Sequence, residues 1–560
     1  MIQEITEILN QIFIKEGYPI TPKITKSEIE GVDFQCNDLF KLAAINHTSP
    51  VEIGEKLEKE INSLDDFSKY FKKVSFSRPG FLNLTLSDEI ICKYIKRLND
   101  DEKLGLKENH QTIVLDYGGP NIAKPLHVGH LRTAIIGQAI NNLLKFQGNK
   151  TISDVHLGDI GLQMGQVIYG ILNDFQNQTP EEIEFDLNYL NVTYPKISGL
   201  CKENEEVKEK CEQITKELQE GNKDYQILWK KICDVSIKDI KRIYKYLSVD
   251  FDLWYGESDA YKYFDELTDY LNKQNILKKD EGALVIDVKE DTDKNEMPPF
   301  IYKKSNGAYL YSSSDLATIY QRQKDYNPDE IIYVADSRQA MHFTQVFRAA
   351  KKSHIFEKEL KHVGYGTVNG KDNKPFKTRS GGAFKLDDLI NEVKETFISL
   401  REENKNMDNE DLDKIANSII KFADLQNDLE RNYIFDIQKF SEVNGKTGPY
   451  ILYTYLRINK LLTSKGKLSN KIYNEKDKNL RMKILEVSNA LNTSIKELKP
   501  HYIANYLYEL SVAANDFYET NHLNKLTGEE KEDYLYILNL NNRIIKALLN
   551  ILGIYIPTKM

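Results

Sequence analysis

One stretch of the chain, residues 112–144, constrains the fold more than any other. It opens with TIVLDYGGPN, a short continuous apolar run closed by Gly-Gly-Pro, which is typical of a buried parallel strand that enters a loop. A helix is expected next, because apolar residues recur every four positions and form one broad face: Leu131, Ile135, Ala139 and Leu143. A parallel strand, a tight loop and an amphipathic helix together predict an open α/β sheet.

Three later apolar runs extend this pattern. They begin at Ala283 (ALVIDV), Glu330 (EIIYVAD) and His362 (HVGYGTV), and helical patterns separate them. This alternation predicts a Rossmann-type α/β parallel sheet with helices on both faces. We assign residues 109–385 to this domain, with a charged helical insertion at about 172–245.

The two ends of the chain show other patterns. Residues 1–108 are predicted to form a small α+β domain, in which Leu82, Leu84 and Leu86 alternate with polar residues as in a half-buried strand. Residues 386–560 carry helical patterns without strand signals, so an all-helical domain is expected there. A length of 560 residues suits such a division into several domains.

Composition excludes several classes of protein. No apolar run is long enough to span a membrane, and the N-terminus carries acidic residues where a signal peptide has a basic start. Five widely spaced cysteines without a C-x-x-C pair indicate reduced thiols, neither a disulfide framework nor a zinc site. We therefore expect a cytoplasmic protein without zinc and without a membrane contact. A net charge of -9 argues against non-specific polyanion binding but allows a local basic groove.

The first candidate site is PNIAKPLHVGHLR, residues 120–132. His127 and His130 lie at the N-terminus of the expected helix, where anions bind in open α/β sheets. Imidazole N–H groups donate to phosphate oxygens, Gly129 lets a flat ring approach the backbone, and Lys124 adds a positive charge. This chemistry predicts a nucleotide site. A metal pair and two structural histidines are the alternatives, although no third metal ligand stands out.

This stretch resembles the HIGH motif region of the class I aminoacyl-tRNA synthetases, and within that class the arginyl-tRNA synthetases. Further blocks follow in the order of that family: HLGDIGLQMG, FDLWYGESD, YLYSSSDLA, DSRQAMHF, GYGTVNGKDNKPFKTRSGG, TGPYILYTYLRI and LGIYIPTKM. The resemblance covers almost the whole chain, and eight ordered blocks are far more specific than one. It implies an N-terminal domain that contacts tRNA, a Rossmann catalytic domain with an insertion, and a helical anticodon-binding domain.

The resemblance also implies a reaction. The carboxylate of L-arginine attacks the α-phosphorus of ATP, pyrophosphate leaves, and the arginyl-adenylate passes arginine to its tRNA. Mg²⁺ is implied as the partner of ATP, activation is expected to depend on tRNA, and the enzyme is expected to be a monomer. No side-chain nucleophile is needed, so catalysis must come from positioning and from groups that stabilise phosphate charge.

The resemblance assigns the catalytic groups to two segments. His127 and His130, with the glycine between them, would bind ATP at the HIGH position. KPFKTRSGG resembles the mobile KMSKS loop, in which Lys377 and Arg379 would reach the β- and γ-phosphates. The final lysine of that pattern has no clear counterpart here, and Lys124 stands where family members carry its replacement. Taken alone, KDNKPFKTR is better explained as a solvated basic loop.

A second set of residues is implied in the selection of arginine. A guanidinium has five donors, which carboxylates and a phenol oxygen accept well. The family's guanidinium ligands match Tyr311 and Asp315, and Glu257 is a third candidate. Taken alone, Asp315 is better explained as the N-cap of the helix LATIYQR, and both roles are compatible.

Asn121, Gln339 and His156 complete the implied contacts to arginine. The first two match positions that hold the α-amino and carboxylate groups. His156 lies in HLGDIG, where many relatives have Asn before the histidine and Trp after the aspartate, whereas this chain has Val155 and an isoleucine there. The α-amino contact from that asparagine is in question, and His156 or Asp154 is a candidate to compensate.

Two other functions compete with this interpretation. A nucleotidyl transferase for a small molecule would share the HxGH sheet, but it has no use for a large RNA-facing module. A non-catalytic RNA-binding relative has no need of the catalytic lysines and histidines. In the helical part, Tyr450, Tyr453 and Arg457 share one helix face and are candidates for stacking on anticodon bases, with a core position as the equal alternative for Tyr453.

Overall fold

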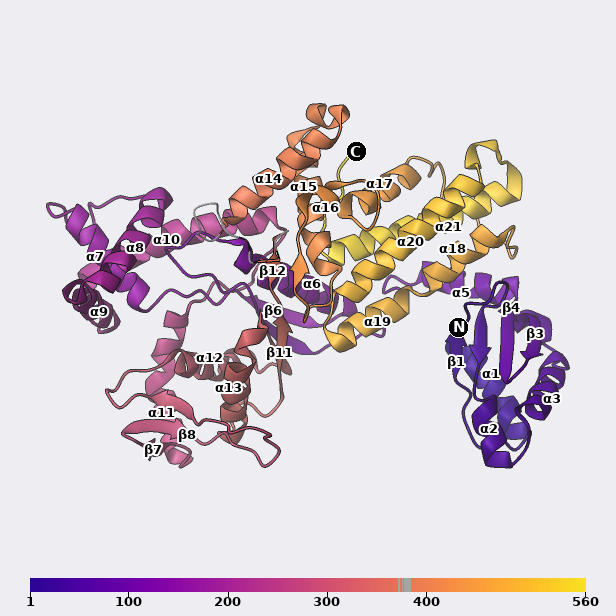
Figure 1. Cartoon of the computed structure of the whole chain (residues 1–560), viewed down its shortest axis with the longest axis horizontal. Helices are drawn as coiled ribbons and strands as arrows, with labels where there is room; N and C mark the ends of the chain where they lie inside the picture. Colours follow the sequence, from indigo (N-terminus) through magenta and orange to yellow (C-terminus); the bar gives the residue numbers. More distant parts are fainter. Residues whose placement is uncertain (371–372, 375, 377–383) are drawn as a thin grey trace. The chain divides into compact units, whose positions relative to one another are not determined.

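The computed structural model describes residues 1–370, 373–374, 376 and 384–560. The chain divides into two compact units: Met1–Gly105, Thr454–Asn489 and Glu509–Ile545 form the first, and Leu106–Tyr453, Ala490–Tyr508 and Lys546–Met560 form the second. The last third of the chain, orange to yellow in Figure 1, is mostly helical. Its helices contribute residues to both units. The three-domain division expected from the sequence stays a prediction.

The second unit is built on a four-stranded parallel sheet with the strand order β11-β10-β5-β6. Its strands are β5 (Thr112–Asp116), β6 (Lys150–Asp154), β10 (Glu330–Asp336) and β11 (Glu359–Tyr365). In register, Ile331 of β10 pairs with Val114 on one side and with Leu360 on the other. The buried strands expected near residues 112, 330 and 362 are thus confirmed, and with them the Rossmann-type α/β fold.

The sheet differs from the prediction in two strands. The run that begins at Ala283 forms β8 (Ala283–Ile286), which belongs to a separate antiparallel sheet with β7 (Lys278–Asp280) and β9 (Phe300–Lys303). Its expected place in the parallel sheet is wrong, because an apolar run indicates burial but does not identify the neighbouring strand. β6 escaped the sequence analysis because four of its five residues are polar and only Ile152 is apolar.

Helices cover both faces of the parallel sheet. α6 (Leu131–Gln147) follows β5, and its expected apolar positions are all buried. The hydroxyl of Thr133 donates to the carbonyl of Val334 at 2.7 Å, which fixes this helix against β10. α12 (Tyr311–Tyr326) and α13 (Ala340–Lys352) bury their apolar side chains against β5 and β10 in a shared core.

A group of helices follows β6 and occupies the place of the expected insertion. They are α7 (Leu162–Asp174), α8 (Leu187–Glu203), α9 (Glu205–Gln219) and α10 (Lys223–Tyr246). Cys201 of α8 and Cys211 of α9 face each other, with their Sγ atoms 3.6 Å apart. All five cysteines of the chain are buried free thiols.

Short elements and further helices complete the second unit. They are η1 (Val128–His130), η2 (Glu257–Tyr263), α11 (Phe264–Lys273), η3 (Ser337–Gln339), β12 (Val368–Asn369), α14 (Leu386–Leu400), η4 (Glu402–Asn406), α15 (Asn409–Leu425), β13 (Tyr433–Ile434) and α16 (Ile437–Ser441). β13 pairs with β12 in parallel, so the part of the chain expected to be all-helical contains one short strand. Four helices have residues in both units: α17 (Gly448–Asn459), α19 (Val487–Glu497), α20 (His501–Thr520) and α21 (Gly528–Ile551).

The first unit contains an antiparallel sheet in the order β1-β2-β4-β3. Its elements are α1 (Ile2–Lys15), β1 (Ile24–Lys26), β2 (Phe34–Cys36), α2 (Leu39–Asn46), α3 (Pro50–Asn62), α4 (Phe67–Tyr70), β3 (Phe71–Ser77), β4 (Phe81–Leu86) and α5 (Asp88–Asp100), with α18 (Glu475–Leu485) and η5 (Leu523–Lys525) from the C-terminal part. Leu82, Leu84 and Leu86 are fully buried in β4, as their alternation predicts.

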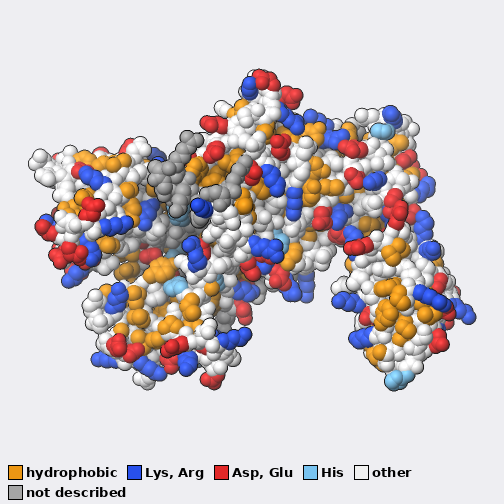
Figure 2. All heavy atoms as spheres, viewed as in Figure 1, with side chains coloured by type: hydrophobic (Ala, Val, Ile, Leu, Met, Phe, Trp, Pro, Cys, Tyr) orange, Lys and Arg blue, Asp and Glu red, His pale blue; other side chains and the backbone are white. Residues whose placement is uncertain are grey.

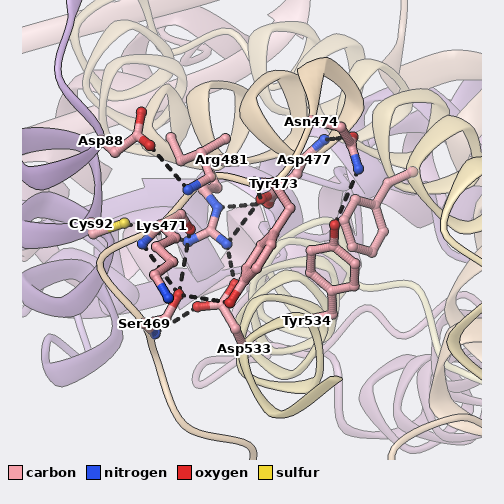
Figure 3. Close-up of polar contacts among 12 residues, drawn as sticks. Asp88, Cys92, Ser469, Lys471, Tyr473, Asn474, Asp477, Arg481, Asp533 and Tyr534 are labelled. Carbon is pink, nitrogen blue, oxygen red and sulfur yellow. Dashed lines mark hydrogen bonds and ion pairs between the residues drawn. The ribbon is translucent and has the colours of Figure 1, made fainter. Parts of the chain in front are cut away.

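A buried ion network joins the N-terminal and C-terminal segments of this first unit (Figure 3). Arg481 of α18 is fully buried, its Nε donates to Asp477 at 2.6 Å, and its Nη2 donates to Asp533 of α21. Its Nη1 lies 3.6 Å from the Sγ of Cys92 in α5. Because a buried guanidinium needs partners on several sides, the network explains why these distant segments form one unit.

The surface carries charges of both signs. Figure 2 shows lysine and arginine side chains interspersed with acidic side chains over the face that it draws. Among the described helices, none is long and apolar enough to cross a membrane.

Candidate active site

The HVGH stretch lies where the loop after β5 meets the start of α6. β5 ends at Asp116, and the loop contains Gly118 and Gly119 with φ values of +100° and +42°, which favour glycine. The turn η1 then leads into α6. The site therefore lies at the carboxyl end of a parallel strand and at a helix N-terminus, which is the ligand-binding position of open α/β sheets.

The imidazoles of His127 and His130 hold each other in place. Their rings are stacked with centroids 3.9 Å apart. The Nδ1 of His130 accepts the backbone N–H of His127 at 3.2 Å, and the Nδ1 of His127 accepts that of Gly129 at 3.0 Å. Since an accepting ring nitrogen carries no proton, the proton of each neutral ring lies on Nε2. Each histidine thus offers one Nε2–H donor.

The charge state of the two histidines follows from their surroundings. Burial lowers the pKa of His130 to about 3, and the charges of His127 and Lys124 act in the same direction. Burial and Lys124 also lower the pKa of His127. At neutral pH both rings are neutral, so toward a phosphate they are hydrogen-bond donors rather than cations. The positive charge next to them comes from Lys124, whose Nζ lies 4.8 Å from the ring centroid of Tyr194.

The described residues next to the KPFKTRSGG segment contact the HVGH stretch. The backbone N–H of Val128 donates to the carbonyl of Phe384 at 3.0 Å, and that of Leu386 donates to Leu126 at 2.9 Å. Lys377 and Arg379, which the resemblance assigns to ATP, lie outside the described residues.

A cavity of about 320 Å³ opens beside these contacts. His127 and Gly129 line it on one side, and Phe376 and Phe384, with ring centroids 5.9 Å apart, line it on another. The cavity is thus lined by the HVGH stretch, by Phe376 of the KPFKTRSGG segment and by Phe384, which follows that segment.

Tyr311 and Asp315 lie one turn apart at the start of α12, whose N-cap is Leu310. The alternative explanation of Asp315 as an N-cap is therefore wrong, because this residue lies inside the helix. It is 4% exposed, and its carboxylate has histidines on two sides. Its Oδ2 lies 2.6 Å from the Nε2 of His342, and its Oδ1 lies 3.9 Å from the Nε2 of His156.

Tyr311 presents its hydroxyl to a group of acidic residues. Its pKa is raised, first by the negative charge of Asp315, then by burial of the hydroxyl and by the charge of Glu257. The residue as a whole is 48% exposed. The phenol is therefore protonated and lies near two carboxylates.

Glu257, the first residue of η2, is the least satisfied carboxyl group of the site. Burial raises its pKa to about 7; the charges of Asp315 and Asp159 add to this effect and that of His156 opposes it. Among the described residues, none donates a hydrogen bond to its side chain. A partly buried carboxylate without a cation is a suitable partner for a positively charged ligand.

His156 lies behind these acceptors. It has a φ of +46°, its side chain is 10% exposed, and neither of its buried ring nitrogens has a hydrogen-bond partner among the described residues. Burial alone would lower its pKa, but the charges of Asp116 and Asp154 outweigh burial and raise it. Its closeness to Asp315 places it toward the guanidinium end of the expected arginine site.

A charge cluster at the ends of β5 and β6 escaped the sequence analysis. Nη2 of Arg322 in α12 donates to Asp116 at 2.6 Å and to Asp154 at 2.7 Å, and the guanidinium is almost completely buried. Asp116, Asp154 and His156 lie close enough together to ligate a metal ion. However, the Arg322 guanidinium already donates to one oxygen of each carboxylate. In the sequence, only the position of Asp116 at the end of a predicted strand pointed to this charge cluster.

The residues expected at the α-amino and carboxylate groups are on neighbouring loops. The backbone of Asn121 pairs with that of Gly158, and its Oδ1 lies 3.5 Å from the Nε2 of Gln163. Gln339 is the last residue of η3, directly after β10. Val155, which replaces the family's asparagine, is fully buried, and its carbonyl accepts the N–H of Gly119 at 2.9 Å.

Comparison with known families gives three matches along the chain. The model of the catalytic domain of class I tRNA synthetases (R) matches residues 95–437. The DALR anticodon binding domain matches residues 451–560, and the arginyl tRNA synthetase N terminal domain matches residues 1–86.

Individual relatives align from end to end. The arginine–tRNA ligase of Alkaliphilus oremlandii is 39% identical over 588 residues, and that of Agathobacter rectalis is 40% identical over 598 residues, with 100% of both chains covered in each case. The arginyl-tRNA synthetase structure from Plasmodium falciparum has a TM-score of 0.81 at 26% identity and covers 100% of this chain and 99% of its own. That from Thermus thermophilus, at 20% identity, has a TM-score of 0.79 with full coverage of both chains and shows likeness of fold. With its catalytic-domain match across more than half of its length and relatives that align throughout, the chain belongs to the arginyl-tRNA synthetases.

Proposed function

We propose that the chain activates L-arginine with ATP and transfers it to its tRNA, with an ATP site at HVGH and an arginine site at the start of α12. The observation that carries this proposal is the group of acceptors formed by Asp315, Glu257 and the Tyr311 hydroxyl. Two carboxylates and a phenol, with Glu257 lacking a partner among the described residues, match the donors of a guanidinium.

In the ATP half of the site, positioned donors stabilise the phosphates. The Nε2–H groups of His127 and His130 donate to phosphate oxygens at the N-terminus of α6, and Lys124 supplies positive charge. Lys377 and Arg379 add charge from the segment whose Phe376 lines the same cavity as His127. ATP enters with Mg²⁺ as its substrate complex. These groups lower the barrier because they are in place before negative charge develops on the leaving pyrophosphate.

In the arginine half, each end of the amino acid has its own set of residues. The guanidinium binds Asp315, Glu257 and Tyr311, while Asn121 and Gln339 hold the α-amino and carboxylate groups. His156 completes the site near the guanidinium end. The carboxylate of arginine is then held for attack on the α-phosphorus, and such positioning accounts for much of the rate enhancement in reactions without a protein nucleophile.

We propose the following division of labour along the chain. Residues 1–108 contact tRNA, residues 109–385 catalyse the reaction with a helical insertion at about 172–245, and residues 386–560 bind the anticodon region. Activation of arginine depends on tRNA. The enzyme acts as a cytoplasmic monomer, and neither zinc nor a membrane takes part.

ATP–pyrophosphate exchange with purified protein tests this proposal. We expect exchange only with arginine and only in the presence of tRNA, and we expect Asp315→Ala to raise the KM for arginine strongly without changing the KM for ATP. Asp325→Ala, on the exposed side of the same helix, is the matched control and should behave like the wild type. Exchange with another amino acid would contradict the arginine specificity, and full exchange without tRNA would contradict the tRNA dependence.

A further inference from the structure

We propose that His342 is a positioning residue that decides which oxygen of Asp315 receives the arginine guanidinium. This inference rests on the proposed function, in which Asp315 binds that guanidinium. His342 lies in the first turn of α13, and sequence patterns gave it no role.

The first observation is the hydrogen bond between the two side chains. The Nε2 of His342 lies 2.6 Å from the Oδ2 of Asp315, and the side chains are 22% and 5% exposed. An ionised carboxylate only accepts hydrogen bonds, so the proton lies on Nε2 and the imidazole donates. A short bond to a charged acceptor, largely shielded from water, is strong enough to fix the rotation of the carboxylate.

The second observation is that the same ring contacts the other guanidinium ligand of this helix. The ring centroids of His342 and Tyr311 lie 5.0 Å apart, with an angle of 30° between the planes. Tyr311 and Asp315 are one turn apart on α12. One imidazole from α13 therefore holds the phenol by ring contact and the carboxylate by a hydrogen bond.

The consequence concerns how arginine is bound. With Oδ2 engaged by His342, Oδ1 is the oxygen of Asp315 that is left for the substrate, on the side of His156. Since His342 occupies one acceptor site of Oδ2, a guanidinium is directed to Oδ1 rather than to a pair with both oxygens of this one carboxylate. It binds Oδ1 and directs its other N–H groups to Glu257 and Tyr311. Recognition of the planar guanidinium therefore depends on acceptors from several residues.

The position of His342 also connects the two ends of the substrate site. Gln339, proposed to bind the α-amino or carboxylate group, is the N-cap residue of α13. His342 follows one turn later on that helix. The start of α13 thus carries one residue for each end of arginine, and a shift of this helix start would change both contacts together.

Variants of His342 separate donation from packing. His342→Phe keeps a ring against Tyr311 and removes the donor, whereas His342→Gln places an amide N–H near the position of Nε2. The matched control is His362→Gln: the ring of His362 stacks on Phe343, the neighbour of His342, with centroids 4.6 Å apart, but its Nε2 faces the carbonyl of Ala335 at 3.2 Å. Aminoacylation is measured for all variants, with the KM for arginine and for ATP, kcat and the melting temperature.

For His342→Phe we expect a rise of roughly tenfold to a hundredfold in the KM for arginine, the effect of losing one hydrogen bond to a charged group, with an unchanged KM for ATP. His342→Gln should recover most of this loss, and His362→Gln should match the wild type. A His342→Phe enzyme with wild-type KM for arginine would overturn the proposal, and so would equal losses in the Phe and Gln variants. If Asp315→Ala also left the KM for arginine unchanged, the proposed function itself would fail. A large effect of Asp315→Ala together with a wild-type KM for arginine in His342→Phe would refute the positioning role alone.

Discussion

The imidazoles of His127 and His130 stack with their centroids 3.9 Å apart, and each uses its Nδ1 to accept a backbone N–H of the turn that leads into α6. This arrangement fixes the tautomer of both rings and makes Nε2–H the donor of each ring, while burial and the charge of Lys124 lower the pKa of both and keep them neutral at neutral pH. The motif is therefore a pair of oriented donors.

The two tasks of His130, as turn acceptor and as phosphate donor, can be separated by substitution. His130→Ala removes both, whereas His130→Asn keeps an acceptor for the N–H of His127 and removes the distal donor. We expect the activation barrier to rise by about 2 to 4 kcal/mol in either variant, by analogy with the loss of one oxyanion donor. The single-turnover activation rate measures the role of His130 as phosphate donor, and the melting temperature measures its role as turn acceptor. A His130→Asn enzyme with the wild-type rate would show that the donor has no catalytic role.

Glu257 predicts a pH dependence of arginine binding. Its pKa is raised to about 7. In most molecules of the free enzyme, the carboxyl group is therefore protonated at pH 6 and ionised at pH 8. A guanidinium pairs with the ionised form, and the KM for arginine should therefore be roughly ten times lower at pH 8 than at pH 6. Glu257→Gln should raise the KM and remove this slope. A slope that persists in the variant would assign the titration to another group.

Lys124 should act through its charge rather than through its contact with Tyr194. For Lys124→Met we expect a loss on the order of a hundredfold in the activation rate, because a cation near the phosphates is removed while the aliphatic stem stays. Lys303→Met is the matched control, since its Nζ likewise lies over a tyrosine ring, 4.7 Å from the centroid of Tyr309. If both variants lose the same amount of activity, the cation–π contact is the cause and the catalytic role of Lys124 is refuted.

Arg322 is expected to contribute to stability more than any surface ion pair. Its removal leaves Asp116 and Asp154 without their cation, and breaking such a buried arrangement costs about 3 to 5 kcal/mol. Arg338→Met removes an ion pair with Asp336 whose arginine is largely exposed, and it should cost less than about 1 kcal/mol. Urea unfolding of Arg322→Met and Arg338→Met gives the comparison, and similar midpoints would contradict the buried-charge interpretation.

Patterns local in sequence predicted the elements that carry the proposed ATP site. The run TIVLD, the glycines after it and the periodicity of Leu131 to Leu143 gave a strand, a loop and a helix at the observed places. The same method misplaced the run at Ala283, because burial in an antiparallel sheet leaves the same apolar signature as burial in a parallel one. It also missed β6, whose polar end residue Asp154 pairs with Arg322, a residue far away in the chain.

In the proposed arginine site, too, local sequence patterns did not predict every contact between side chains. Motif matching brought Tyr311, Asp315 and Glu257 forward as ligands, and the structure brings their polar groups into one electrostatic neighbourhood. The local rule that made Asp315 an N-cap failed because the helix begins earlier, after Leu310. His342 and Arg322 had no signal in sequence at all, since each matters only through a partner that the fold brings near.

The amino-acid sequence by itself determined the order of the motifs, the periodicity of the helices and strands, and the family of the chain, because these depend on neighbours within a few turns or on matched blocks. The tertiary structure decided the tautomers of His127 and His130, the lack of a hydrogen-bond donor to the Glu257 side chain among the described residues, and the bond from His342 to Asp315. Protonation, desolvation and hydrogen bonding depend on which groups lie within a few ångströms in space. In an α/β fold those groups come from the ends of strands that are far apart along the chain.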